Sequence, residues 1–142
     1  MNKIRILLVD DDSEDRAFFK EALFEIAPTT YLSTVNDGND ATKFLAECAE
    51  PDLPCVIVID YLMPIMNGPE LLDWICGRPK FNGINKIVWS TAYDQKYIDG
   101  CLSKGAIEYF KKANNYNGIK VIVQKVLAYC NYHPVFDIIS KA

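Results

Sequence analysis

Residues able to carry charge-based chemistry stand directly after four short apolar runs. They are Asp10-Asp11-Asp12 after residues 6–9, Asp60 after 55–59, Ser90-Thr91 after 87–89, and Lys111-Lys112 after 106–110. If these ends converge in the fold, the carboxylates repel one another and need a cation. The available ligand atoms there are oxygens, with no histidine and no thiolate pair nearby, which favours Mg²⁺.

Asp60 follows the most apolar of these runs, residues 55–59. Beside a divalent cation and a lysine ammonium, a buried carboxylate is suited to in-line attack on phosphorus, because both cations neutralise the equatorial oxygens. The product would be an aspartyl phosphate. A hydroxyl at the end of the neighbouring strand could then hydrogen-bond one phosphoryl oxygen.

The elements that must position these residues alternate regularly. Short apolar runs predict five strands, at residues 4–9, 31–35, 55–59, 87–89 and 106–110, and each is followed by a segment with helical spacing of apolar residues. Gly105 is placed to end the fourth helix. Strict alternation predicts an α/β fold with a parallel sheet covered on both faces, whose strands all end at one edge. Ligands of such sheets bind at that edge.

Composition limits the function further. The chain has 142 residues, 24% of them charged, and a net charge of −4, which fits one domain and disfavours nonspecific binding to nucleic acid or to a membrane surface. No apolar run approaches the roughly 18 residues of a membrane span, and no export signal is credible, so we expect a cytoplasmic protein. The five cysteines form no C-x-x-C pair, which favours a reducing compartment and buried thiols over disulfides or zinc.

Four blocks of the sequence resemble those of a response-regulator receiver domain. They are ILLVDDD at 6–12, VIDYLMPIMNG at 58–68, STA at 90–92 and KGAIEYFKK at 104–112. The resemblance covers about residues 3–130. It implies a doubly wound, five-stranded parallel sheet of flavodoxin-like order 2-1-3-4-5, with helices on both faces.

The resemblance also implies a function and a site. Asp60 would accept a phosphoryl group from a histidine kinase or a histidine phosphotransfer protein, and Asp10, Asp11, Asp60 and the backbone carbonyl of Leu62 would hold Mg²⁺. The protein would be a single-domain response regulator in a phosphorelay rather than an enzyme, acting on a downstream protein by contact. Residues 1–130 would form the receiver domain, while the tail 131–142, with the lone His133, receives no assignment.

Several positions need a choice between neighbours. Counting without gaps from Asp60 places the family's switch hydroxyl on Ser90. The family's usual Thr-Ala pair is matched one residue later, by Thr91-Ala92. We favour Ser90. Successive strand residues point to opposite faces, so only one of Lys111 and Lys112 can enter the pocket, and the same frame selects Lys112. Tyr109 resembles the family's switching aromatic residue.

Two further positions, Asp12 and Ala113, lead to predictions about local structure. Asp12 is expected to cap the first helix rather than to bind metal. The family's usual proline after the lysine is replaced by Ala113, so a trans peptide bond is expected there.

Three other functions fit parts of the pattern. A haloacid-dehalogenase-like Mg²⁺-dependent phosphotransferase would use Asp10-Asp11-Asp12 as its Asp-x-Asp, but Glu14 replaces its Thr or Val and little room remains for its cap. A flavodoxin-type binder would need a phosphate-cradling first loop, where three aspartates would repel the ligand. An interaction module that keeps the fold without phosphate would not require all five of Asp10, Asp11, Asp60, Ser90 and Lys112.

Overall fold

The computed structural model describes residues 3–130, which form a five-stranded, all-parallel sheet in the order β2-β1-β3-β4-β5. The strands are β1 (Arg5–Val9), β2 (Tyr31–Val35), β3 (Val56–Ile59), β4 (Asn85–Ser90) and β5 (Glu108–Lys111). This is the predicted fold class and strand order.

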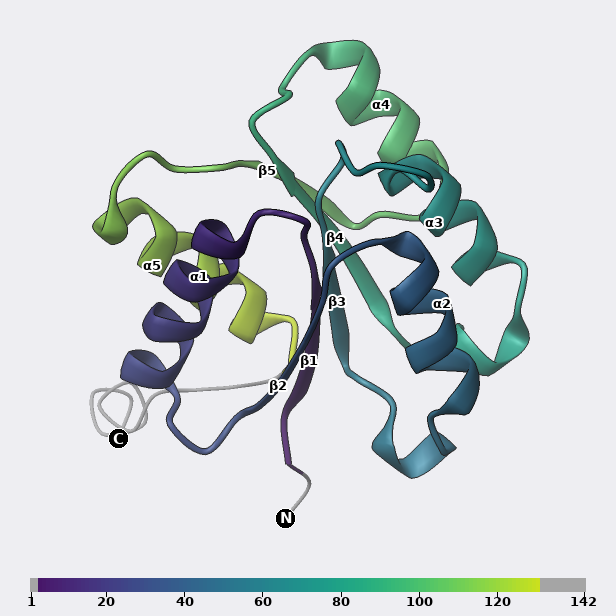
Figure 1. Ribbon diagram of the computed structural model, residues 1–142, viewed down its shortest axis with the longest axis horizontal. Helices are drawn as coiled ribbons and strands as arrows, with labels where there is room; N and C mark the ends of the chain where they lie inside the picture. The colour runs from purple at the N-terminus through teal and green to yellow at the C-terminus, as the bar shows by residue number, and fades with distance from the viewer. Residues whose placement is uncertain (1–2, 131–142) are drawn as a thin grey trace, which may run out of the picture.

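Each strand is followed by an α-helix, and the five helices cover both faces of the sheet (Figure 1). They are α1 (Ser13–Ile26), α2 (Gly38–Glu47), α3 (Gly68–Cys76), α4 (Gln95–Ser103) and α5 (Tyr116–Ala128), with short 3₁₀ turns at Glu50–Asp52 and Pro79–Phe81. In Figure 1, α1 and α5 lie on one face and α2, α3 and α4 on the other.

The core is divided by the sheet into two apolar clusters. Alternate residues of β1 serve different clusters: Leu7 and Val9 pack toward α2 and α3, whereas Ile6 and Leu8 pack toward α1 and α5. All four residues of β3 are fully buried, which explains why its run is continuously apolar rather than alternating.

Strand register brings the ends of β1 and β3 together. Val9 pairs with Ile59, and the Asp60 N–H donates to the Val9 carbonyl at 2.9 Å, so Asp10 and Asp60 leave adjacent strands side by side. On the other half of the sheet, the Lys112 N–H donates to the Ser90 carbonyl at 2.9 Å. The predicted convergence of the strand ends is therefore present.

Element boundaries differ modestly from the prediction. β4 starts at Asn85 because Asn85 and Lys86 extend the ladder with β3, although neither is apolar. β5 starts at Glu108, after the turn that ends α4. In that turn Gly105 has φ +102°, and a Cβ atom on it would lie 2.7 Å from the Cys76 sulfur, so glycine is needed for both backbone and space.

The expectation of unpaired cysteines is wrong for two of the five. Cys55, just before β3, and Cys130, just after α5, form a disulfide with a Cα–Cα distance of 5.8 Å. Of the free cysteines, only Cys101 is fully buried, while Cys76 is exposed. Spacing rules look for local pairs, whereas this pair, 75 residues apart, is created by the packing of α5 beside β3.

Within residues 3–130, every peptide bond is trans, including the one before Ala113. In the same segment there is no helix whose length and apolar character would suit it to crossing a bilayer. The tail 131–142 and His133 lie outside the described residues.

Candidate functional site

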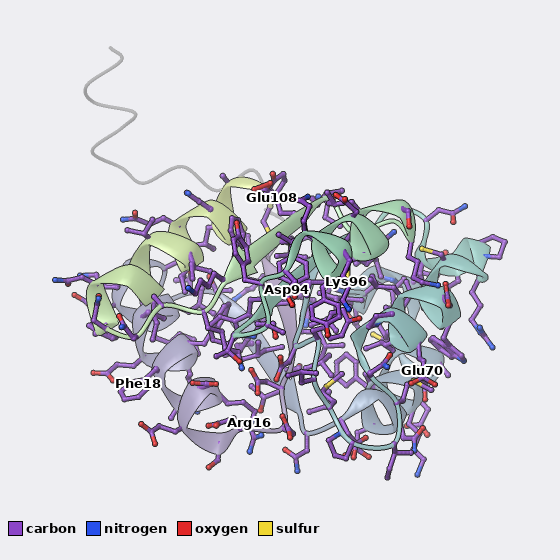
Figure 2. All side chains as sticks on the ribbon, turned by 90° about the horizontal axis from the view of Figure 1, so that it is seen from above. Arg16, Phe18, Glu70, Asp94, Lys96 and Glu108 are labelled. Carbon is purple, nitrogen blue, oxygen red and sulfur yellow. A yellow bond between two sulfur atoms is a disulfide. The ribbon has the colours of Figure 1, made fainter. Side chains whose placement is uncertain are left out.

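Three carboxylates gather at the edge of the sheet where the strands end. Oxygens of Asp10, Asp11 and Asp60 lie within 4.8 Å of one another. Asp10 and Asp60 are 0% and 5% exposed, while Asp11 is on the surface. Figure 2 views the molecule from this side, with Arg16 marking α1 and Asp94 marking the start of α4.

Lys112 is the lysine that reaches this cluster, whereas Lys111 is exposed. The Lys112 ammonium lies 2.8 Å from Asp10 Oδ2, 2.8 Å from Asp15 Oδ2 and 3.3 Å from Asp60 Oδ2. Its side chain is only 8% exposed. A single buried cation thus neutralises part of a site that contains four acidic side chains.

Burial and mutual repulsion perturb the acids. Loss of solvent, followed by the nearby Asp10 charge, raises the pKa of Asp60 to about 6, even though Lys112 opposes the shift. Burial likewise raises the pKa of Asp10 above its ordinary value. Burial disfavours the charged ammonium, but hydrogen bonds to Asp10 and Asp15 prevail and raise the pKa of Lys112, so it stays protonated.

Asp10 is fully buried, and its two oxygens have different partners. Oδ1 accepts the Asp12 N–H at 2.9 Å, whereas Oδ2 lies 2.8 Å from the Lys112 ammonium. The oxygens of Asp10, Asp11 and Asp60 lie close enough together to bind one ion. The oxygen-only donor set therefore fits a hard divalent ion.

The loop after β3 is folded tightly against Asp60. The Gly68 N–H donates to the Tyr61 carbonyl at 2.9 Å, and a Cβ at Gly68 would lie 2.9 Å from Tyr61 Cα, so only glycine permits this approach. The Leu62 N–H lies 3.4 Å from Asp60 Oδ1. Ile65 adopts φ +69°, a conformation that costs energy for a β-branched residue, and is 81% exposed.

Ser90 and Thr91 occupy different environments. Ser90 is fully buried and its Oγ accepts the Ala92 N–H at 3.2 Å, whereas Thr91 is exposed. Tyr109 is also buried, and its hydroxyl donates to the Ala92 carbonyl. Burial raises the pKa of Tyr109 to about 12, so the phenol keeps its proton.

The start of α1 supplies two acidic residues with separate tasks. Asp12 is the N-cap, accepting the N–H groups of Glu14 and Asp15 at 2.9 and 3.0 Å, as expected. Asp15 contacts Lys112, which sequence reasoning missed. The only local signal was an acidic residue in a first helical turn, and the helix dipole alone accounts for that.

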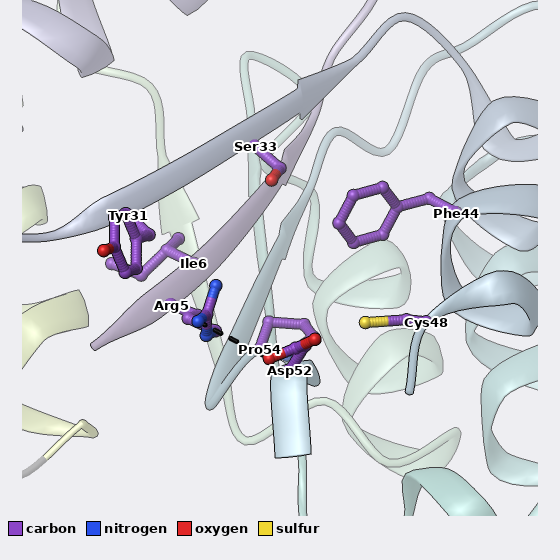
Figure 3. A pocket seen from close by; sticks show the side chains of 8 residues that line it. All are labelled: Arg5, Ile6, Tyr31, Ser33, Phe44, Cys48, Asp52 and Pro54. Atoms are coloured by element: carbon purple, nitrogen blue, oxygen red, sulfur yellow. Dashed lines mark ion pairs between the residues drawn. The ribbon is translucent and has the colours of Figure 1, made fainter. Parts of the chain in front are cut away.

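A separate pocket of about 290 Å³ lies near the opposite ends of the strands (Figure 3). It lies beside Arg5 and Tyr31, the first pair in the β1–β2 ladder, with Phe44 of α2 and Cys48, just after α2, across from them. Its charged residues, Arg5 and Asp52, pair with each other at 3.5 Å. It is thus distinct from the acidic cluster.

Comparisons with known proteins agree on one family. The family model "Response regulator receiver domain" matches residues 6–124. Among curated relatives, the two-component response regulator ORR5 of Oryza sativa subsp. japonica is 29% identical, with 86% of this chain and 87% of the relative covered. The two-component response regulator ARR8 of Arabidopsis thaliana is 28% identical, but this chain spans only 55% of its length.

Solved structures give the same result. The phosphorylated cyanobacterial phytochrome response regulator RcpA has a TM-score of 0.79 at 27% identity, with 87% of this chain and 91% of that chain covered. The Mn²⁺-bound form of response regulator Rcp1 has a TM-score of 0.76 at 25% identity, with the same coverage. These matches do not favour the haloacid-dehalogenase alternative. The receiver family is a signalling, phosphoacceptor family, and this chain, a receiver domain homologous to two-component response regulators, belongs to it.

Proposed function

We propose that this protein accepts a phosphoryl group on Asp60 from a phosphohistidine of a histidine kinase or of a histidine phosphotransfer protein. The observation that carries the proposal is the buried cluster in which Asp10 and Asp60 share the Lys112 ammonium at the carboxyl ends of the strands. Receiver domains of two-component systems interact with these two classes of protein. Residues 1–130 would form the receiver domain, with 131–142 as its tail.

The reaction assigns defined roles to the residues of the chain. An Asp60 oxygen forms the new bond to phosphorus, the phosphorus–nitrogen bond of the donor breaks, and its electron pair returns to the histidine ring. The Lys112 ammonium, 3.3 Å from Asp60 Oδ2, would lie close enough to hydrogen-bond a phosphoryl oxygen. Burial of the pocket strengthens this interaction.

Mg²⁺ is the proposed metal, held by Asp10, Asp11, Asp60 and the backbone carbonyl of Leu62. The close approach of the three carboxylates and the all-oxygen donor set support this choice, and the solved structure of Rcp1 contains Mn²⁺. When bound, the ion would neutralise charge on the transferring phosphoryl group. Asp12 would take no part, because its carboxylate caps α1.

Ser90 and Tyr109 are the proposed switch residues. The Ser90 hydroxyl would leave the Ala92 N–H to donate to a phosphoryl oxygen, drawing the β4–α4 connection toward Asp60. Tyr109, whose hydroxyl is bonded to the Ala92 carbonyl, would sense that movement directly. The signal would then pass to a downstream protein by contact.

A cytoplasmic location belongs to the same proposal, since a phosphohistidine donor would have to reach Asp60. The cysteine argument for a reducing compartment does not extend to Cys55 and Cys130, which form a disulfide.

Beryllofluoride, which mimics an aspartyl phosphate, tests the proposal when added with Mg²⁺. We expect saturable binding by the wild type and none by Asp60→Asn, with Asp52→Asn, at the other end of the sheet, behaving as wild type. Binding that survives Asp60→Asn would contradict the assignment. Steady turnover of phosphate esters would instead favour a phosphotransferase.

A further inference from the structure

Lys112 has one more carboxylate partner than the proposed transfer to Asp60 requires. Asp10 and Asp60 belong to the cluster that would hold a divalent ion, but Asp15, 2.8 Å from the ammonium, lies outside it. Asp15 comes from the first turn of α1, 97 residues away along the chain. It is therefore a contact that the fold has brought to Lys112 independently of the metal ligands.

We propose that Asp15 is a positioning residue for Lys112. Its carboxylate holds the ammonium directed at Asp60 while a cation occupies the oxygens of Asp10. This inference rests on the proposed phosphoryl transfer to Asp60, and it assigns Asp15 no contact with the reacting atoms.

Trp89 also contacts the Lys112 ammonium. Its ring centroid is 5.1 Å from the Lys112 ammonium, within the range of a cation–π contact. The indole is 1% exposed and packs edge-on against Phe19, with centroids 5.4 Å apart, so its position is fixed by the core. The ammonium thus contacts both a rigid aromatic ring and the Asp15 carboxylate.

An anchor outside the cluster becomes necessary when a metal binds. With a cation bound, the charges of Asp10 and Asp60 would be shared between that ion and the Lys112 ammonium, so two of the three ion pairs would weaken together. The four-carbon stem of lysine is flexible, so a weakened ammonium could turn away from Asp60. Asp15, whose side chain is 31% exposed at the mouth of the site, keeps its charge for Lys112.

Asp15 also has a purely helical role, which must be separated from this one. Its N–H bonds to Asp12, and a carboxylate in the first turn of α1 is favoured by the helix dipole whatever it contacts. Glu14 precedes it in the same turn, carries the same charge and is exposed. Because Lys112 has its three ion pairs, among described residues, with Asp10, Asp15 and Asp60, Glu14→Gln is a matched control for loss of charge and dipole.

The test compares Asp15→Asn, Asp15→Glu and Glu14→Gln with the wild type. Phosphorylation is measured with acetyl phosphate at saturating Mg²⁺, and Mg²⁺ affinity is measured separately by titration. We expect Asp15→Asn to lower the rate by about three- to tenfold relative to Glu14→Gln, the scale of the net contribution of one ordinary hydrogen bond. The Mg²⁺ Kd should agree within about twofold between these two variants, and Asp15→Glu should recover part of the rate.

A spectroscopic readout reports the ammonium itself. In a Trp74→Phe background, emission comes from Trp89, because the sequence has only two tryptophans. We expect the Mg²⁺-induced change in emission to be at least about twofold larger in Asp15→Asn than in Glu14→Gln, since the unanchored ammonium leaves the ring. Loss of helix stability alone would not produce that difference.

Equal rates and equal emission changes in Asp15→Asn and Glu14→Gln, in a wild type that is phosphorylated normally, would overturn the role of Asp15 alone. A faster Asp15→Asn would overturn it as well, by making Asp15 a competitor for Lys112. A wild type that takes up no phosphoryl group on Asp60 would instead overturn the proposed function.

Discussion

At the carboxyl ends of the strands, the Lys112 side chain is 8% exposed, and its ammonium contacts three carboxylates, two of them buried. At the amino ends, the Arg5 side chain is 37% exposed and pairs with that of Asp52, which is 59% exposed. Both regions combine a basic side chain with acids at the edge of the same sheet. They differ in solvent access, and this difference determines how strongly the charges act on one another.

The comparison indicates that the carboxyl ends of the strands hold buried charges that repel one another. Burial there raises the pKa of Asp60 to about 6, so the metal-free site is held under electrostatic repulsion at neutral pH. Near the amino ends, by contrast, the Cys55–Cys130 disulfide fastens the start of β3 to the end of α5. The carboxyl ends of the strands thus concentrate unfavourable charge, whereas a disulfide lies near their amino ends.

The largest effect is expected from removing the buried ammonium. Lys112→Met keeps an apolar stem but leaves Asp10, Asp15 and Asp60 without their shared cation, which should lower the free energy of unfolding by about 3 kcal/mol. Mg²⁺ should restore part of the loss, because it supplies positive charge to the same carboxylates. Thermal unfolding with and without Mg²⁺ measures both quantities.

Lys111→Met is the matched control for that change. Lys111 is exposed, so its loss should alter stability by less than about 0.5 kcal/mol. A larger cost for Lys111→Met than for Lys112→Met would show that the wrong lysine has been assigned, and the switch hydroxyl would then be reconsidered as Thr91.

The second-largest effect is expected from removing the Cys55–Cys130 disulfide. The disulfide joins residues 75 positions apart and so restricts the unfolded chain. Replacing Cys55 and Cys130 together by serine should lower the free energy of unfolding by about 2–4 kcal/mol under non-reducing conditions. The Mg²⁺-induced rise in the unfolding midpoint should be unchanged, because the acidic cluster lies at the other edge.

Reduction of the wild type provides an independent check of the same bond. Dithiothreitol should lower the midpoint of the wild type toward that of the double variant and leave the double variant where it is. If the reductant shifted both proteins equally, the stabilisation could not be ascribed to Cys55–Cys130.

Lys112 and the Cys55–Cys130 disulfide also show what could and could not be predicted from the sequence. The strands and the convergence of their ends were predictable, because apolar runs and parallel connections determine where each strand ends. The strand order was predicted from the resemblance to receiver domains. The choice of Ser90 over Thr91 rests on the resemblance to receiver domains. Ser90 is buried at the end of β4, whereas Thr91 lies beyond the strand and is exposed.

The missed features all depend on packing between distant segments. Asp15 meets Lys112 across 97 residues and Cys55 meets Cys130 across 75, so no local spacing encodes either pair. Each pair forms only if α1 or α5 packs at a particular position along the strands. That position depends on the packing of the side chains of both helices. The positive φ of Ile65 belongs with them, since the tight loop that ends at Gly68 imposes it against the residue's own preference.

A smaller effect is expected from pH. The folded pKa of Asp60, about 6, lies above its ordinary value of 3.8, so between these values the folded protein binds more protons than the unfolded chain. The contribution of Asp60 to the free energy of unfolding must therefore fall as pH rises from about 4 to above 6. Without metal, we expect the loss to be on the order of 1–2 kcal/mol.

The variant Asp60→Asn isolates that contribution from other titrating groups. At pH 4, wild type and variant should have similar stability, and at pH 7.5 the variant should be the more stable by about 1–2 kcal/mol. Saturating Mg²⁺ should reverse the order at pH 7.5, because the ion binds the ionised wild-type cluster more tightly. A stability difference that does not vary with pH in metal-free buffer would contradict the raised pKa.

The smallest effect is expected at the amino ends. Asp52→Asn removes the partner of Arg5, but both side chains are well exposed and 3.5 Å apart, so solvent and salt already weaken the attraction. Arg5 keeps its contact with the Tyr31 ring, 4.6 Å from the guanidinium carbon, and is not left isolated. Thermal unfolding should therefore change by less than about 0.5 kcal/mol. If Asp52→Asn instead cost as much as Lys112→Met, burial would not be what distinguishes the two edges, and the raised pKa of Asp60 would need a cause other than loss of solvent.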